Sequence, residues 1–172
     1  MRLEKRLRAF NEMRGALLDE MEALDPAKLV ARPRVGKWTI LEIIEHLVLA
    51  ERAVLQDLPE PSELSAHERT IKHRFAYLIV MFVLRYGIPV PVPSPAMVPR
   101  GNRSLVDLRR LWDENQRWLG AYIGGLDRKG LRRAVFGHPV AGPLTVGQAV
   151  RMDQVHLKTH VRQIKRLQRL LN

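Results

Sequence analysis

Apolar residues recur at spacings of three and four along most of this chain, the pattern of helices with one buried face. Leu3, Leu7 and Phe10 begin the first such series. It ends before Pro26, because proline disfavours helical backbone at the residue that precedes it. Helices are predicted over residues 3–24, 40–56, 105–123 and 145–171, with a further helix over 66–86.

Pairs of polar residues three positions apart mark the starts of the later helices. A Ser or Thr side chain at the N-cap accepts a backbone hydrogen bond, and the side chain three residues on returns one. The pairs are Thr39 with Glu42, Ser65 with Glu68, Ser104 with Asp107, and Thr145 with Gln148. Trp38, just before the first of these caps, is placed to pack against Ile43.

The connections between the predicted helices differ in kind. Residues 88–101 contain five prolines, which favours an extended, polyproline-like crossover over a flexible linker. Residues 126–144 combine a basic turn with Gly-Pro-rich sequence, for which we expect a loop or a short hairpin. The whole chain, residues 1–172, is therefore expected to form a single all-α domain with one long crossover between its middle helices.

The stretch from Phe75 to Leu84 is apolar on every side of its predicted helix. It is too short to span a bilayer, which takes about 18–20 residues. A helix of this kind is either buried on all sides or covered by a partner subunit. The pattern therefore predicts a homodimer that forms through this helix.

The absence of cysteine limits the kinds of site that the chain can form. The chain has no cysteine, which excludes disulfides, a thiolate zinc site and a catalytic thiol. Any metal must then be bound by histidine, carboxylate or water, a ligand set that favours zinc, nickel, iron or manganese.

Lysine and arginine outnumber aspartate and glutamate by 29 to 18, for a formal net charge of +11. Such a charge raises nucleic acid, acidic lipid or an anionic substrate as partners. The basic residues are scattered, however, and no aromatic-and-basic strand pattern accompanies them, so a basic solvated surface is favoured over nucleic-acid binding. The N-terminus is charged throughout and lacks a secretory pattern, and we expect a cytoplasmic protein without a membrane span.

The last predicted helix carries His156 and His160 one turn apart, on the same face as Asp153. The apolar series continues on both sides of these residues, which indicates a polar pocket partway along a bundle core. A third ligand is wanted from elsewhere, and His46 is the histidine inside another strongly apolar helix. Three histidines with an open fourth position are typical of a catalytic metal site. Spacing alone leaves open that the pair faces solvent and that His46 is a hydrogen-bonded core residue.

Other polar residues have weaker claims to a role. Asp153 is either a partner that orients a metal-bound imidazole or a solvated acid, and Gln163 either bonds near the metal or lies on the surface. Glu42 is favoured as a capping acid. The remaining histidines are expected on the surface or in loops, and the tryptophans of the third long helix in core and rim packing: His67, His73 and His138, and Trp112 and Trp118. No catalytic residue is assigned, because no Ser-His-Asp set and no phosphate-binding glycine loop is present.

Three motifs together carry a resemblance to a known family. Residues 37–47, Lys-Trp-Thr-Ile-Leu-Glu-Ile-Ile-Glu-His-Leu, resemble the tryptophan-capped second helix of the DinB/YfiT-like superfamily. Residues 137–145, Gly-His-Pro-Val-Ala-Gly-Pro-Leu-Thr, are similar to the lead-in to that family's last helix. Residues 156–164, His-Leu-Lys-Thr-His-Val-Arg-Gln-Ile, are similar to its closing H-x-x-x-H-x-x-Q-I pattern. The chain departs from that pattern at Val161 and Arg162, where the family often has a small residue and glycine.

The resemblance implies an up-down-down-up four-helix bundle, often dimeric, with nickel, zinc or another divalent ion on His46, His156 and His160. It also implies a small-molecule substrate and a low-molecular-weight thiol partner, since characterised members are thiol-dependent transferases or isomerases. A metal-dependent hydrolase stays open, as do a non-enzymatic dimeric bundle that binds a small ligand and a basic nucleic-acid-binding protein. The sequence names neither the metal nor the reaction.

Overall fold

The structure, a computed structural model, describes residues 2–61 and 69–171. The described part holds six α-helices, two short 3-10 turns and one β-hairpin. The elements are α1 (Arg2–Glu22), α2 (Pro26–Val30), α3 (Ile40–Gln56), α4 (Ile71–Tyr86), η1 (Pro95–Met97), α5 (Leu105–Gly124), η2 (Gly130–Arg132), β1 (Ala134–His138), β2 (Gly142–Thr145) and α6 (Val146–Leu170).

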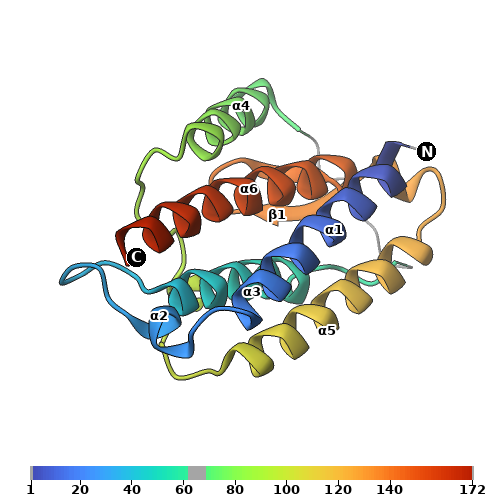
Figure 1. Cartoon of the computed structure of the whole chain (residues 1–172). Coiled ribbons are helices and arrows are strands. Elements are labelled where there is room, and N and C mark those ends of the chain that lie inside the picture. Colours follow the sequence, from blue (N-terminus) through green and yellow to red (C-terminus); the bar gives the residue numbers. More distant parts are fainter. Residues whose placement is uncertain (1, 62–68, 172) are drawn as a thin grey trace.

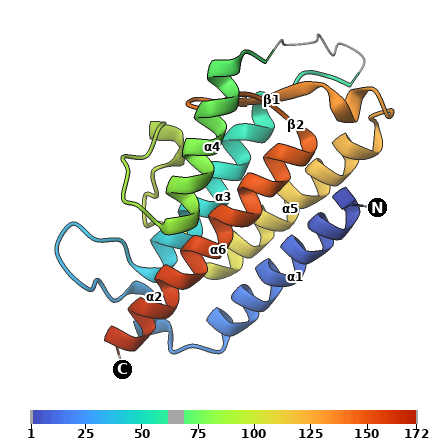
Figure 2. The same ribbon diagram turned by 90° about the horizontal axis from the view of Figure 1, so that it is seen from above.

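Helices α1, α3, α5 and α6 form the predicted up-down-down-up four-helix bundle. Figures 1 and 2 show α1 and α6 running in one direction and α3 and α5 in the other. α3 packs against α5 and α6, and α6 also packs against α1. Because α3 and α5 are parallel, the chain needs a long connection between them, and this connection carries α4.

The starts of the bundle helices follow the caps expected from the sequence. Thr39 and Glu42 exchange both hydrogen bonds of a capping box, and Ser104 Oγ accepts the backbone N–H of Asp107. At the start of α6, the side chain of Gln148 accepts the backbone N–H of Thr145 at 3.0 Å. These local bonds fix where each helix enters the bundle.

Helix α4 differs from its prediction in two ways. It begins at Ile71 and not at residue 66, with Thr70 as N-cap, and Gly87 ends it in the left-handed conformation at φ 64°. Ser65 and Glu68, the expected cap, lie outside the described residues. Only the side of α4 that faces α6 and β2 is buried, and Tyr77 lies on this side. Of the two alternatives for this helix, burial on all sides is therefore wrong.

The connections contain more structure than their composition suggested. Asp25 caps a short helix, α2, with Pro26 at its first position, where proline is well tolerated. This helix is not among those predicted from the sequence. The proline-rich crossover is largely extended, but the η1 turn within it carries Met97, which is buried against α3. Residues 134–145 form the short hairpin expected as one alternative, with β1 antiparallel to β2.

Two apolar clusters make up the core. The first joins α1, α3, α5 and α6 around residues such as Phe10, Ile43, Trp112 and Leu157. The second ties the hairpin and α4 to the bundle: Leu55, Tyr77, Leu119, Tyr122, Val135, Phe136, Ala141, Leu144, Val146, Val150 and Met152. In the described part of the chain, no helix is both long and apolar enough to cross a membrane.

Candidate metal site

The three histidines singled out in the sequence meet in the bundle, between α3 and α6. Nε2 of His156 lies 3.3 Å from Nε2 of His46 and 3.0 Å from Nε2 of His160. His46 is buried, whereas the other two rings are partly exposed. One ligand atom from each ring falls within 4.8 Å of the others, and among the described residues this is the group that could hold a metal ion.

Hydrogen bonds on the far side of two rings fix which nitrogen faces the centre. Nδ1 of His46 lies 2.8 Å from the backbone oxygen of Met97, and Nδ1 of His160 lies 2.8 Å from Oε1 of Gln163. Both oxygens only accept, so each Nδ1 donates a proton to them. In a neutral imidazole the other nitrogen then carries a lone pair. Nε2 of His46 and of His160 are therefore both oriented as ligand atoms.

The contacts among the three Nε2 atoms are compatible with a bound cation. With lone pairs on His46 and His160, Nε2 of His156 can donate a proton to only one of them. The other short N···N contact then has no proton directed along it, and a cation held by all three nitrogens would remove this conflict. Zn–N bonds of about 2.0–2.1 Å at tetrahedral angles place nitrogens about 3.3–3.4 Å apart. The observed 3.0 and 3.3 Å agree with such a donor set.

Burial keeps these imidazoles in the neutral form that a metal requires. It lowers the pKa of His46, and it lowers the pKa of His160 to about 4. The pKa of His156 falls well below its ordinary value, first through burial and then through the neighbouring histidines. At neutral pH all three rings are thus ready to bind a cation without first losing a proton.

The crossover is tied to α3 beside the site. Oε2 of the buried Glu45 accepts the backbone N–H groups of Arg100 and Gly101, at 3.1 and 2.8 Å. Together with the bond from His46 to Met97, these contacts hold residues 97–101 of the crossover against α3. The Trp38 ring covers His46, with ring centroids 4.9 Å apart.

For other polar residues, the structure shows which of the alternative roles left open by the sequence is observed. Gln163 bonds a site histidine, so the less favoured alternative for it is the one observed. Glu42 closes its capping box and also pairs with Arg32. Arg162, where the chain departs from the family pattern, donates hydrogen bonds to the carbonyl of Arg85 at the end of α4 and to Oγ1 of Thr159.

Asp153 is half-buried, and within the described part of the chain it forms no hydrogen bond with His156. Its charge couples to that of Glu51, a residue of α3 that is 7% exposed. Glu51 accepts hydrogen bonds from Nε1 of Trp112 at 2.8 Å and from Nε2 of Gln116 at 2.7 Å. Burial raises the pKa of both carboxyls, that of Asp153 to about 7. Glu51 was not singled out from the sequence, although a glutamate inside so apolar a helix indicates a buried acid.

Among the other histidines of the described part, His138 is close enough to His156 to help lower its pKa, but it does not belong to the converging group of three. His73 helps to cap α4, and His138, at the end of β1, accepts the backbone N–H groups of Val140 and Ala141 in the hairpin turn. His67 lies outside the described residues. Trp112 is 1% exposed and belongs to the core, whereas Trp118 is 39% exposed at the rim, as predicted.

The chain is similar to known proteins over nearly its whole length. A sequence model of the DinB superfamily matches residues 9–164. The uncharacterized protein YuaE of Bacillus subtilis (strain 168) is 26% identical over 170 residues, which cover 92% of this chain and 94% of the relative. The crystal structure of TT2238, a four-helix bundle protein, is similar with a TM-score of 0.51 and 25% identity, over 91% of this chain and 94% of that one.

Proposed function

The chain belongs to the DinB superfamily, and from this premise we propose that it binds one divalent metal ion through His46, His156 and His160. Nickel and zinc are the foremost candidates, because neutral imidazoles suit both. The observation that supports this proposal best is the convergence of three Nε2 atoms, two of which are held as acceptors by bonds on the other side of the ring.

Such a site supports metal-assisted chemistry on a small molecule. A divalent ion on three histidines, with a further position open, acts as a Lewis acid and lowers the pKa of a bound thiol or water. The residues of this chain hold and orient the ligand rings, and the Trp38 ring and the crossover cover the His46 side. His156 and His160 are partly exposed, which leaves an approach for a substrate from their side.

We infer that the reaction is a thiol-dependent transfer or isomerisation, with a metal-dependent hydrolysis as the alternative. The characterised members that the chain resembles use low-molecular-weight thiols. Because this chain has no cysteine, any thiol in the reaction must come from a cosubstrate. No side chain near the three histidines is assigned as a catalytic acid, base or nucleophile.

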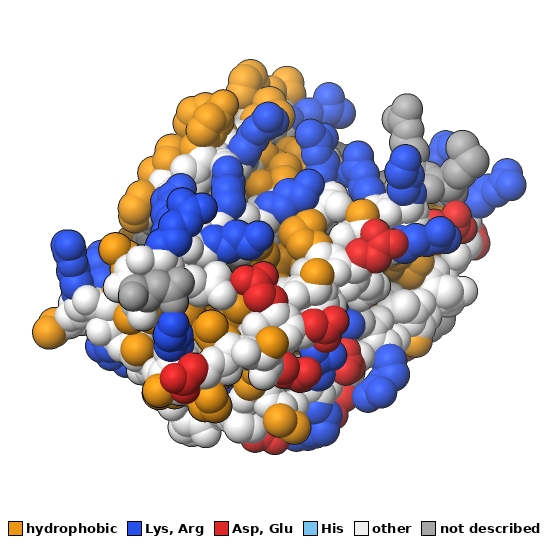
Figure 3. Space-filling view, viewed as in Figure 1, with side chains coloured by type: hydrophobic (Ala, Val, Ile, Leu, Met, Phe, Trp, Pro, Cys, Tyr) orange, Lys and Arg blue, Asp and Glu red, His pale blue; other side chains and the backbone are white. Residues whose placement is uncertain are grey.

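We also propose a homodimer through α4. The outer side of this helix exposes large apolar side chains, each more than half accessible: Ile71, Phe75, Leu78, Ile79, Phe82 and Tyr86. Figure 3 shows hydrophobic side chains gathered on the surface over α4. Patches of this kind on soluble proteins mark interaction surfaces, and a second α4 would supply a matching apolar surface.

Metal analysis of protein purified without an affinity tag tests the binding proposal. We expect about one nickel or zinc ion per chain in the wild type and almost none in His160→Ala, because two ligands hold a divalent ion poorly. His73→Gln is the matched control: it also removes a histidine, but glutamine can replace it in the capping box of α4. Equal metal content in all three proteins would contradict the proposal.

Activity then separates an enzyme from a binding protein. Turnover of a thiol with an electrophilic acceptor, lost in His160→Ala, would support the transferase, and turnover of an ester or amide without thiol would support the hydrolase. Full metal content without turnover in any of these assays would favour the non-enzymatic ligand-binding bundle.

A further inference from the structure

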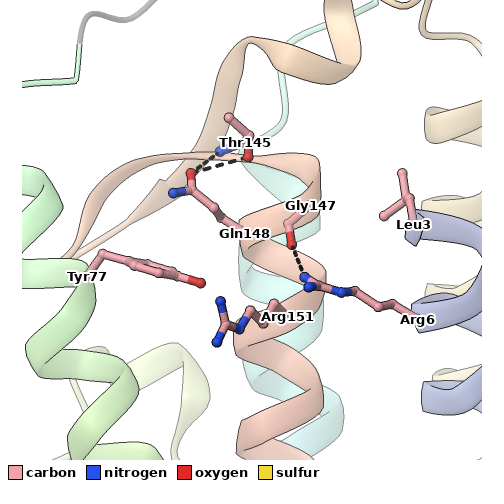
Figure 4. A pocket seen from close by; sticks show the side chains of 7 residues that line it. All are labelled: Leu3, Arg6, Tyr77, Thr145, Gly147, Gln148 and Arg151. Atoms are coloured by element: carbon pink, nitrogen blue, oxygen red, sulfur yellow. Dashed lines mark hydrogen bonds between the residues drawn. The ribbon is translucent and has the colours of Figure 1, made fainter.

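Tyr77 of α4 carries a buried hydroxyl that has no hydrogen-bond partner in the part of the chain that the structure describes. The residue is 7% exposed. A buried hydroxyl without a partner costs free energy, so native proteins seldom retain one unless something else bonds to it. Figure 4 shows this hydroxyl directed into the space between α4 and α6.

Three arginines surround this hydroxyl. Arg151 and Arg6 reach toward it from α6 and α1, and the guanidinium of Arg69 lies 5.8 Å from the centre of the Tyr77 ring. Burial raises the pKa of the Tyr77 phenol, and the positive charges of these three residues oppose the rise.

Among residues 2–61 and 69–171, no carboxylate forms an ion pair with Arg6, Arg69 or Arg151. The recorded ion pairs involve other arginines, and Arg6 donates only to the backbone oxygen of Gly147, at 3.3 Å. Nε and Nη2 of Arg69 are buried and have no partner in the same part of the chain. Three guanidinium groups therefore share one region with an unsatisfied hydroxyl and no anion.

Arg6, Arg151 and Tyr77 border an open cleft of about 330 Å³. Its lining comes from α1, α4 and the first turns of α6: Leu3, Arg6, Tyr77, Thr145, Gly147, Gln148 and Arg151. The free backbone N–H groups at a helix N-terminus, and the positive end of the helix dipole, favour an anion at this place. Arg151 is exposed at the cleft, so a ligand can reach the buried hydroxyl from solvent.

We propose that this cleft is a binding site for a small anion, with a carboxylate or phosphate group bound by Arg6, Arg151 and the Tyr77 hydroxyl and with Arg69 behind the tyrosine ring. Oxyanions suit this set, because guanidinium groups donate paired hydrogen bonds to them and the hydroxyl adds a third donor. The site is separate from the three histidines: α6 lies between the cleft and α3 in Figure 4, and Arg151 points away from the face that carries His156.

Titration of the full-length protein with inorganic phosphate, and separately with acetate, tests the proposal at constant ionic strength. We expect saturable binding on the order of millimolar for at least one of the two, measured by calorimetry. Tighter binding of phosphate would assign the site to phosphorylated ligands, and tighter binding of acetate to carboxylates. Absence of saturable binding of either anion would overturn the proposal.

Two variants on α6 test whether the anion binds in this cleft. Arg151→Gln should weaken it about tenfold, because a charge-assisted hydrogen bond is lost. Arg166→Gln is the control, since it removes the same charge from an exposed position of the same helix, and it should bind like the wild type. Equal weakening in both variants would show only general electrostatic attraction and would overturn the proposal.

Tyr77→Phe separates binding from a structural role. The ring stays in place and only the unpaired hydroxyl is lost, so the thermal midpoint without anion should stay the same or rise. Anion binding should still weaken several-fold. A lower midpoint together with unchanged anion binding would show that the hydroxyl serves the fold and not a ligand.

Discussion

The Nδ1 atom of His46 donates a hydrogen bond to the backbone oxygen of Met97 at 2.8 Å, across 51 positions of the sequence. This bond joins α3 to the η1 turn of the proline-rich crossover. It fixes the tautomer of His46 and directs Nε2 toward His156. The crossover thus acts on the candidate metal site through a single backbone carbonyl, and its placement should matter for metal affinity.

Loosening the crossover should weaken metal binding without touching a ligand. Glu45→Ala removes the acceptor for the N–H groups of Arg100 and Gly101, so Met97 is held less firmly against His46. We expect zinc affinity to fall about tenfold or more, as for other groups that orient metal ligands. Competition with a chromophoric chelator measures it. Glu45→Gln, which keeps an acceptor oxygen, should retain most of the affinity, and equal losses in both variants would contradict this role.

The bond from His160 to Gln163 should contribute in the same way. Gln163→Ala leaves Nδ1 of His160 without its acceptor, and the ring is then free to turn or to change tautomer. Zinc affinity should fall about tenfold. Gln168→Ala, on the same helix and bonded only to Glu20, is the control and should bind zinc as tightly as the wild type. Unchanged affinity in Gln163→Ala would show that packing alone orients His160.

The carboxyl pair of Glu51 and Asp153 should make stability depend on pH. Asp153 has a pKa of about 7 in the folded protein, whereas an aspartate in an unfolded chain titrates near 4. The folded state therefore holds a proton that the unfolded state has lost, and this contribution is fully present below about pH 4 and is lost as pH rises through about 7. Over that range the free energy of unfolding should fall by up to about 1 kcal/mol per pH unit.

Asp153→Asn should remove the part of this dependence that Asp153 contributes and raise stability above neutral pH, because asparagine is neutral at every pH. The part that comes from the buried Glu51 should remain. Urea unfolding of metal-free protein from about pH 5 to about pH 8 measures the change. Asp25→Asn is the control. Asp25 is an exposed N-cap, and asparagine caps a helix as well as aspartate does. A difference in the free energy of unfolding between wild type and Asp153→Asn that stays the same at every pH would rule out a raised pKa of Asp153.

Dimerisation through α4 is testable by sedimentation. Leu78→Glu places a charge in the middle of the exposed apolar side, and the proposed dimer should dissociate to a monomer at micromolar concentration. Val106→Glu is the control, since Val106 is an equally exposed apolar residue, 73% accessible, on α5. A wild type that is already monomeric at that concentration would contradict the proposal.

Local signals were enough to predict most of the fold. The apolar spacing located the four bundle helices, and caps such as Thr39 and Ser104 fixed their first residues. The start of α4 was misplaced because two Ser/Thr residues, Ser65 and Thr70, both precede candidate capping partners, and spacing does not choose between them. α2 was missed because five residues are too few for a periodic pattern, although Asp25-Pro26 is a helix start.

The three histidine side chains of the candidate site were predicted from the sequence. His156 and His160 share a helical face by spacing, and His46 follows from the resemblance and from its apolar surroundings. The contact of Met97 with His46 could not be predicted, because it uses a backbone carbonyl and depends on how the crossover docks. The same holds for Arg151 and Tyr77, which meet only once α4 packs against α6.

Anomalous diffraction from a crystal of the tag-free protein tests the central claim most directly, because it locates a metal by its own absorption edge. The account predicts one strong peak within about 2.0–2.3 Å of Nε2 of His46, His156 and His160, and no such peak in His160→Ala. A wild-type crystal grown with nickel or zinc that shows no peak among the three rings would contradict it.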